Sequence, residues 1–345
     1  MVFIFHFWGF FQEKLNFYAD FFLIPFKAGH LGIDIFFVLS GLLLFLSIAR
    51  DGQVKIDFFY RRFWRLVPLA FTVTILLFIL KGPSFWFSIL GIKNLIFHLL
   101  FLQSLSLDTY WNLNPVMWTL TLEMLFIIIL PLLIYLSFKR KKVFLSLIFS
   151  LLILNFLYRF FVFNFFEIWS VKEKIFYSEQ LWGRFDQFAL GIFSGVLLIS
   201  PQNILKKITP FVSFLLSFLG LLGLIISFFI FASLGSDFRS NLFLQLFLHF
   251  FTAFSFVIFL GGFLSNQNKF IKKIFAPLIF EKFGKISYSF FLWHFPVLSV
   301  LKKFIDSPLW GFLLALLFSI ILSMLSYIFI EKNLYLFFRK VRYKV

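Results

Sequence analysis

The chain has 345 residues, of which 61% are hydrophobic and only 14% charged, whereas a typical soluble domain has about 45–50% and about 25%. Such a small number of polar residues cannot cover the surface of a soluble protein. The composition therefore excludes a soluble enzyme and a disordered chain and predicts a polytopic membrane protein. The net charge of +17 fits basic cytoplasmic loops without nucleic-acid binding, and the absence of cysteine excludes disulfides and thiolate metal sites.

Apolar segments of roughly membrane-spanning length recur along the whole chain. We predict spans at residues 31–48, 66–80, 116–137, 143–163, 185–200, 211–234, 242–264, 287–301 and 309–330. Residues 1–11 are apolar too and make an incomplete tenth span, whereas polar residues interrupt 85–102, so we expect a short interfacial or re-entrant helix there. The predicted fold is therefore an all-α bundle of about ten transmembrane helices, in one membrane domain over residues 1–345.

Basic residues in the loops indicate the orientation of these spans. We take the loop with residues 50–65 as lying on the inside of the membrane and place successive loops on alternate sides. With this assignment, 21 of the 32 Lys and Arg residues lie in inside segments. Cytoplasmic loops collect Lys and Arg, so we predict that both termini are cytoplasmic. One extra crossing by residues 85–102 would invert every later loop, which is a second argument that this stretch does not cross.

Polar residues inside the spans are informative, because a charge at a helix centre costs about 2.5–3.5 kcal/mol on insertion scales. His6 lies in the apolar run MVFIFHFWGFF; it suits general base catalysis, but equally fits a histidine hydrogen-bonded within the bundle. Asp34 lies among Gly32, Ser40 and Gly41, which allow close helix contact. This group indicates a tightly packed cavity wall more than a catalytic triad.

Further along the chain, Arg62 and Arg65 are three residues apart at the cytoplasmic end of a span and share a face if this segment is helical. Orientation by positive charge explains them on composition alone; the functional alternative is a phosphate clamp, because guanidinium groups match phosphate oxygens. Glu123 lies inside VMWTLTLEMLFIIILP, where a carboxylate is costly unless paired, and this position favours a functional role.

Two later segments complete the set of candidate residues. Arg184 and Asp186, in GRFDQFALG, stand at a span entrance and fit an ordinary interfacial ion pair. His294 lies near the end of KISYSFFLWHFP and also fits an interfacial histidine beside Trp293 in an aromatic belt.

Taken together and in this order, these segments resemble acyltransferase family 3 of bacterial integral membrane proteins. The resemblance is carried by GHLGIDIFFVLSGLLL, FFYRRFWRLVPL, VMWTLTLEMLFIIILPLL, GRFDQFALG and ISYSFFLWHFP, and it extends from His6 to about Glu331. It implies transfer of an acyl group, usually acetyl, from cytoplasmic acyl-CoA to a hydroxyl of a cell-envelope or exported glycan. The implied location is the bacterial inner membrane, in contact with lipid and without nucleic acid.

The resemblance also implies roles for individual residues. His6 matches the family's catalytic histidine and would be the base that deprotonates the acceptor, with an acyl-histidine intermediate as an open alternative. Glu123 and Asp34 would orient or charge-balance a catalytic group, and Arg62 and Arg65 would bind the CoA phosphates. The remaining expected cavity or structural residues are Gly32, Ser40, Gly41, Trp118, Arg184, Asp186, Ser287, Tyr288 and His294. No metal is expected, since the five histidines show no close ligand spacing.

The sequence departs from the family pattern at four places. Phe126 and Phe291 stand where tyrosine is frequent, and Asn333 stands where a proline often follows the glutamate matched by Glu331. The arginine eleven positions before the histidine would fall before Met1. Residues 1–11 span only about 16 Å as a helix, against a bilayer core of about 30 Å, so we expect that the chain as given starts too late within its first helix.

Two other interpretations of the sequence remain open. One is an inactive family member that lost the catalytic pair together with the arginine. The other is a transporter or flippase of an envelope precursor, because buried polar residues also mark substrate paths; the sequence shows no inverted repeat to favour it. The acyl group, the acceptor and the oligomeric state are not specified by the sequence.

The loop charges make the topology testable. Reporter fusions at Lys141 and Lys272 should give a cytoplasmic signal, and a fusion at Lys172 should give an external signal, because the basic inside loops stay in the cytoplasm. A cytoplasmic signal at Lys172 would contradict the predicted alternation of spans.

Overall fold

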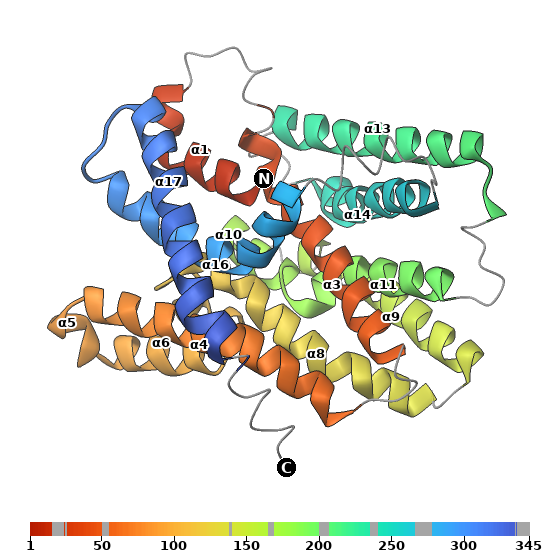
Figure 1. The fold of residues 1–345 in the computed structure, drawn as a ribbon, viewed down its shortest axis with the longest axis horizontal. Helices are drawn as coiled ribbons and strands as arrows, with labels where there is room; N and C mark the ends of the chain where they lie inside the picture. The colour runs from red at the N-terminus through yellow and green to blue at the C-terminus, as the bar shows by residue number, and fades with distance from the viewer. Residues whose placement is uncertain are drawn as a thin grey trace. The chain divides into compact units, whose positions relative to one another are not determined.

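The computed structural model describes residues 1–15, 24, 26–49, 55–137, 140–164, 169–199, 207–234, 241–265, 278–334 and 336. These residues form helices and no strand, which confirms the predicted all-α fold (Figure 1). The elements are α1 (Val2–Leu15), η1 (Ala28–Leu31), α3 (Gly32–Ala49), α4 (Ile56–Leu80), α5 (Pro83–Trp86), α6 (Ile89–Leu99), η2 (Gln103–Leu105), α7 (Leu107–Tyr110), η3 (Pro115–Met117), α8 (Trp118–Ser137), α9 (Lys141–Asn164), α10 (Val171–Ser178), α11 (Leu181–Leu198), α13 (Pro210–Leu234), α14 (Leu242–Ser265), α16 (Leu278–Leu301), α17 (Pro308–Ser326) and η5 (Tyr327–Lys332).

Seven helices of the described chain are long and apolar enough to cross a membrane. They span Ala28–Ala49, Ile56–Leu80, Pro115–Tyr135, Lys142–Asn164, Pro210–Leu234, Leu242–Ser265 and Pro308–Lys332. Each coincides with a span predicted from the sequence. The helices α11 and α16 also occur where we predict spans, but they do not meet the same measure of length and hydropathy. The chain is thus a multi-pass membrane protein, and the number of ten spans remains a prediction.

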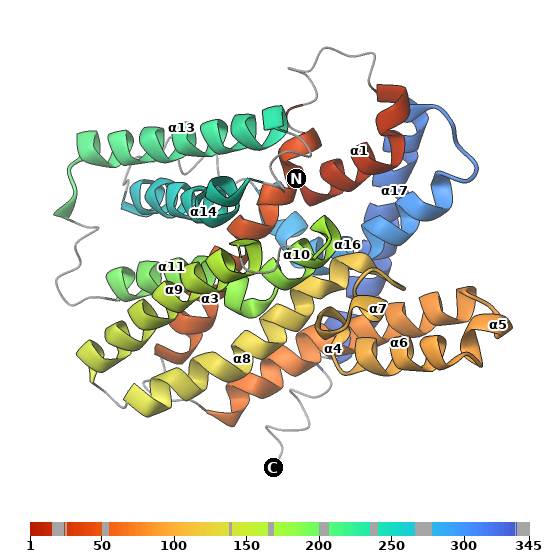
Figure 2. The same ribbon diagram turned by 180° about the vertical axis from the view of Figure 1, so that it is seen from behind.

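The segment after α4 turns back as a short helix. Gly82 has a φ of 88°, a left-handed conformation that glycine adopts easily, and this turn lets α6 run back beside α4 (Figures 1 and 2). The Ser88 hydroxyl accepts a hydrogen bond of 2.9 Å from the Gly91 N–H and caps the helix. With 11 residues, α6 is about 16 Å long, too short for a span, as the sequence predicts.

The chain divides into two compact units. Unit 1 consists of Met1–Phe5, Ala19–Val54 and Leu122–Phe275; unit 2 consists of His6–Tyr18, Lys55–Thr121 and Ala276–Val345. Each unit is therefore assembled from segments that are far apart in the sequence, and each brings its own set of polar residues together.

In unit 1, α3 and α11 pack closely through glycine residues. A Cβ atom on Gly41 would overlap the Phe188 carbonyl, and one on Gly191 would overlap the Val38 carbonyl. Small residues allow such backbone contact in membrane helices, where no hydrophobic effect drives helices together. The helices α13 and α14 lie side by side in the same way (Figures 1 and 2). The predicted role of Gly41 as a packing residue is consistent with this contact.

In unit 2, side-chain hydrogen bonds connect α16 with α4 and α17. The Tyr288 hydroxyl donates to the Leu66 carbonyl, and the Trp293 indole N–H donates to the Ser326 hydroxyl at 2.8 Å. Lys14 at the end of α1 pairs with Asp306, just before α17. These bonds hold α16, the helix that carries His294, between its neighbours.

Candidate active site

A pair of histidines connects α1 and α16 in unit 2. His6 Nδ1 lies 2.9 Å from His294 Nε2, and the two rings are stacked with centroids 5.1 Å apart. His294 is buried, and its own Nδ1 lies 3.2 Å from the Phe290 carbonyl oxygen. The structure thus brings together the two histidines that the sequence places at opposite ends of the chain.

The hydrogen bonds of this pair assign the tautomer of each ring. A carbonyl oxygen only accepts, so His294 Nδ1 carries a hydrogen and donates it to Phe290. Neutral His294 then has a lone pair on Nε2, which accepts from His6 Nδ1. His6 is left with a lone pair on Nε2, and this is the nitrogen that a general base needs. A structural histidine of the bundle makes the same kind of hydrogen bond, so the role of His6 as a base stays a prediction.

Polar contacts continue along α16 before His294. The Ser289 hydroxyl donates to Glu331, which is buried at the end of the α17–η5 segment. The Arg65 charge acts on the same carboxylate from α4. Ser287 is exposed and donates only to the Gly284 carbonyl, one turn earlier in its own helix. Of the three predicted residues on α16, Tyr288 and His294 make contacts between helices, and Ser287 makes none within the described chain.

The basic residues of α4 lie close to its start. Arg65 is exposed and Arg62 is partly exposed, and their spacing of three residues in a continuous helix places them on one face. The segment is helical, as the shared face of Arg62 and Arg65 requires. Two guanidinium groups on one face form a geometry that suits phosphate oxygens.

Arg184 is the centre of a buried ionic cluster in unit 1. Its Nη1 donates to Asp34 at 2.9 Å, and its Nε and Nη2 donate to the two oxygens of Glu179. The second oxygen of Asp34 lies 2.9 Å from His249 Nδ1 on α14. His30 extends the cluster, with its Nε2 3.7 Å from Glu179. We call these five residues the Arg184 cluster; it joins η1, α3, α11 and α14.

Glu179 stands between α10 and α11, before the apolar part of α11. Burial alone would raise the pKa of its carboxyl group, but Arg184 and His30 favour the charged form more strongly and hold the pKa well below its ordinary range. The carboxylate therefore stays ionised, which the fork of two hydrogen bonds from Arg184 requires.

Asp186 has a different partner from the one expected. Its two oxygens accept from Arg159 on α9 at 3.1 and 3.2 Å, and Arg159 also donates to the carbonyls of Gly183 and Leu246. The interfacial pair of Arg184 with Asp186 that the sequence suggests does not form. The reason is geometric: residues two apart in a helix point to different sides, so each finds a partner on another helix.

The other predicted residues lie in their expected helices. Glu123 and Ser40 are buried in α8 and α3, at 5% and 8% exposure, and Gly32 begins α3 beside Met1. Trp118 begins α8 and stacks on Tyr110 with centroids 6.1 Å apart. Glu123 belongs to unit 1 and His6 to unit 2, so a direct role of Glu123 on the base stays a prediction.

Sequence reasoning missed four members of these charged groups: Glu179, His249, His30 and Arg159. His249 and Arg159 lie inside predicted spans, so the rule that singled out Glu123 would have found them too. Glu179 and His30 lie outside the apolar segments, where charged residues are common and do not indicate a functional site. Among the described residues, no group of three or more His, Asp or Glu side chains is arranged to hold a metal ion.

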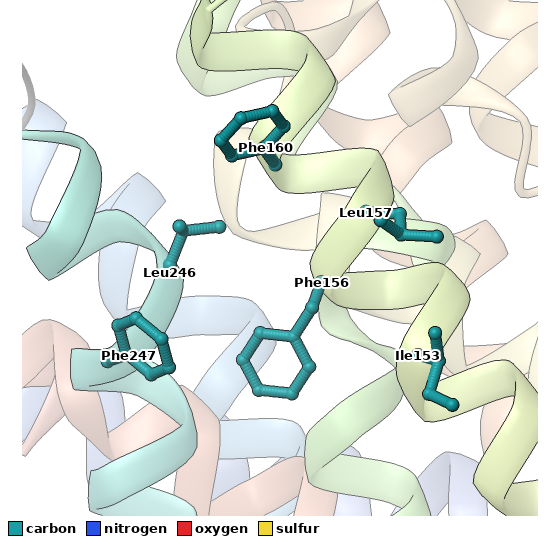
Figure 3. Close-up of a pocket in the computed structure, with 6 residues that line it drawn as sticks. All are labelled: Ile153, Phe156, Leu157, Phe160, Leu246 and Phe247. Atoms are coloured by element: carbon teal, nitrogen blue, oxygen red, sulfur yellow. The ribbon is translucent and has the colours of Figure 1, made fainter.

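A separate apolar pocket of about 350 Å³ lies between α9 and α14. Six apolar side chains line it, as Figure 3 shows: Ile153, Phe156, Leu157, Phe160, Leu246 and Phe247. This pocket presents no polar side chain that could carry out a reaction.

The Arg184 cluster yields a prediction about stability. Arg184→Leu leaves two buried carboxylates, Asp34 and Glu179, without their common partner, and breaking a buried ion pair costs about 3–5 kcal/mol. We expect a large drop in the midpoint of thermal unfolding in detergent. Lys93→Met removes a lysine from the more exposed pair with Asp108 and serves as the control, with little change expected. Equal midpoints for wild type and Arg184→Leu would contradict the structural role of the cluster.

Comparison with known proteins identifies the family of the chain. A family model described as an acyltransferase domain matches residues 1–328. Over 309 residues, the chain is 26% identical to the peptidoglycan O-acetyltransferase OatA of Listeria monocytogenes serovar 1/2a (strain ATCC BAA-679 / EGD-e); this covers 79% of the chain and 46% of that protein. The chain thus spans about half the length of this curated relative. No solved structure shows a significant match. Since the family model covers nearly the whole chain, this multi-pass membrane protein belongs to acyltransferase family 3.

Proposed function

We propose that this acyltransferase moves an acetyl group from cytoplasmic acetyl-CoA to a hydroxyl group of a cell-envelope glycan. The observation that carries the proposal is the hydrogen bond between His6 and His294, because it leaves a lone pair on His6 Nε2. The relative that acts on peptidoglycan supports the choice of a glycan acceptor and of acetyl. We further propose the bacterial inner membrane as the location, with both termini in the cytoplasm.

In the proposed reaction, His6 Nε2 takes the proton of the acceptor hydroxyl. The oxygen of that hydroxyl attacks the carbonyl carbon of the thioester at the same time. The C–S bond then breaks, CoA leaves as the thiolate, and the acetyl group remains on the acceptor oxygen. A thioester is already activated, so deprotonation and positioning are the main tasks of the enzyme. An acetyl-histidine intermediate stays an alternative.

His294 has a supporting part in this step. When His6 Nε2 accepts the proton, the ring becomes positively charged, and its Nδ1–H still donates to the lone pair of His294 Nε2. This bond fixes the ring and stabilises its charge, and a hydrogen bond from a charged donor is about twice as strong as a neutral one. His294 thus acts as a positioning residue for His6.

Arg62 and Arg65 are proposed to bind the phosphates of the CoA donor. The support is their common face on α4, where Arg65 is exposed and Arg62 partly exposed, because guanidinium groups match phosphate oxygens. The role of Asp34 is best described as structural, because both of its oxygens contact members of the Arg184 cluster. A catalytic contribution of Asp34 or Glu123 remains a prediction from the sequence.

The role of His6 can be tested by substitution. His6→Ala should lower acetyl transfer by about 10²–10⁴-fold, the usual contribution of general base catalysis. His294→Gln should lower it by less, because His6 keeps its basic nitrogen and loses only its orientation. Transfer is measured with the purified protein in lipid nanodiscs, after membrane yield and monodispersity have confirmed folding. Near-wild-type transfer by His6→Ala would show that another group is the base.

The role of the arginines gives a separate prediction. Replacing Arg62 and Arg65 together by Gln should raise KM for acetyl-CoA and leave KM for the acceptor nearly unchanged, since only the donor carries phosphates. Lys81→Gln is the matched control, because Lys81 is an exposed basic residue at the opposite end of α4. If KM for the donor stays level while protein yield falls, the two arginines serve only to orient the span.

A further inference from the structure

Three buried carboxamide side chains of unit 2 lie on α6 and in the segment between α6 and α8. Asn94, Gln103 and Asn114 are each 0% exposed. Every one of them donates from its NH₂ group to a backbone carbonyl: Asn94 to Leu90 at 2.9 Å, Gln103 to Met117 at 2.6 Å, and Asn114 to Leu292 at 2.9 Å. We call these three residues the carboxamide cluster.

These bonds determine which end of each amide is the oxygen. A carbonyl accepts and cannot donate, so the end that faces it must be the NH₂ group. The oxygens Oδ1 of Asn94, Oε1 of Gln103 and Oδ1 of Asn114 are buried and have no hydrogen-bond partner within the described chain. One buried acceptor without a partner costs about 1–3 kcal/mol. Three in one segment therefore require an explanation.

Hydrogen bonds place Gln103 and Asn114 beside η3, and helix packing brings α6, which carries Asn94, against the same region. Gln103 binds Met117, the last residue of η3, and Asn114 is the residue that precedes η3. Asn94 lies on the buried face of α6, which packs against η2, the turn that contains Gln103. Asn114 binds the carbonyl of Leu292, two residues before His294. The cluster is therefore connected directly to the helix of the proposed catalytic pair.

The backbone around the cluster is strained. Phe101 and Leu113 have φ angles of 56° and 45°, and they are the two non-glycine residues with positive φ in the described chain. Such conformations cost of the order of 1–3 kcal/mol each, and they concentrate at ligand sites and active sites. Irregular backbone in a membrane protein also persists only where it is covered by protein or lines a polar cavity.

The chemistry of the cluster selects its ligand. Three neutral acceptor oxygens match a molecule with several hydroxyl donors, such as a saccharide. They do not match the CoA phosphates, which need cations or N–H donors, and a divalent cation prefers carboxylate ligands, which the cluster lacks. We propose that the carboxamide cluster is the subsite that binds the hydroxyl groups of the saccharide acceptor. This inference rests on the proposed function and adds the residues that recognise the acceptor.

The test uses the full chain in nanodiscs and the disaccharide N-acetylglucosaminyl-N-acetylmuramic acid as the probe. Asn94→Leu is the most informative variant, because the Asn94 amide bonds only to its own helix and its loss disturbs little else. We expect Asn94→Leu and Gln103→Leu each to raise the Kd for the disaccharide about 3- to 10-fold, the effect of one neutral hydrogen bond. KM for acetyl-CoA should not change.

Asn155→Leu is the matched control. Asn155 is a buried carboxamide of unit 1 that also donates to a carbonyl, that of Trp182, and that also has an oxygen without a partner in the described chain. If loss of any buried amide weakens the protein generally, this variant will show the same effect on Kd. A change in Kd for Asn94→Leu and Gln103→Leu but not for Asn155→Leu supports the subsite.

Two results would overturn the inference. The first is equal Kd values for wild type and both cluster variants, which would mean that buried water satisfies the three oxygens. The second is no binding of the disaccharide by wild type. Failure of the proposed function gives a different result. Wild type would then bind the disaccharide without acetylating it, and the subsite would still be decided by the same comparison of Kd values.

Discussion

Every charged group that this chain buries among its apolar helices needs a partner, and this constraint determines how both units are built. Water cannot compensate such a group within a bilayer, so an unpaired charge there is costly. Arg184 is the clearest case: it is 1% exposed and uses three of its nitrogens to bind two carboxylates. The pairs of Arg184 fix α11 against α3, while Arg159 and Asp186 fix α11 against α9.

The same constraint operates in unit 2 with neutral groups, among them the histidine pair that contains the proposed base. His294 compensates the polar edge of His6 without a full charge, so His6 keeps its basic nitrogen. Ser289, on the same helix as His294, compensates Glu331 of η5. Within the described chain, the carboxamide cluster departs from this pattern, as Asn155 does in unit 1, since the NH₂ groups have partners and the acceptor oxygens do not. A group that the protein leaves without a partner is the natural place for a polar substrate to bind.

Helices and spans could be predicted from the sequence because they depend on local composition alone. The contacts between them could not, because the partners are far apart: Asp34 meets a histidine 215 positions later, and His6 meets one 288 positions later. Where the sequence suggested a local pair, of Arg184 with Asp186, the expectation was wrong because helix geometry separates residues two apart. The ordered motifs nevertheless identified the family, since they carry information that hydropathy lacks.

The central claim is that this protein transfers an acetyl group from acetyl-CoA to a glycan hydroxyl. The most direct measurement is mass spectrometry of the acceptor after incubation of the purified chain, in nanodiscs, with acetyl-CoA labelled with ¹³C in both acetyl carbons. The account predicts a disaccharide that has gained one labelled acetyl group as an ester. Label that is released only as free acetate, or that stays on CoA while the acceptor is unchanged, would contradict it.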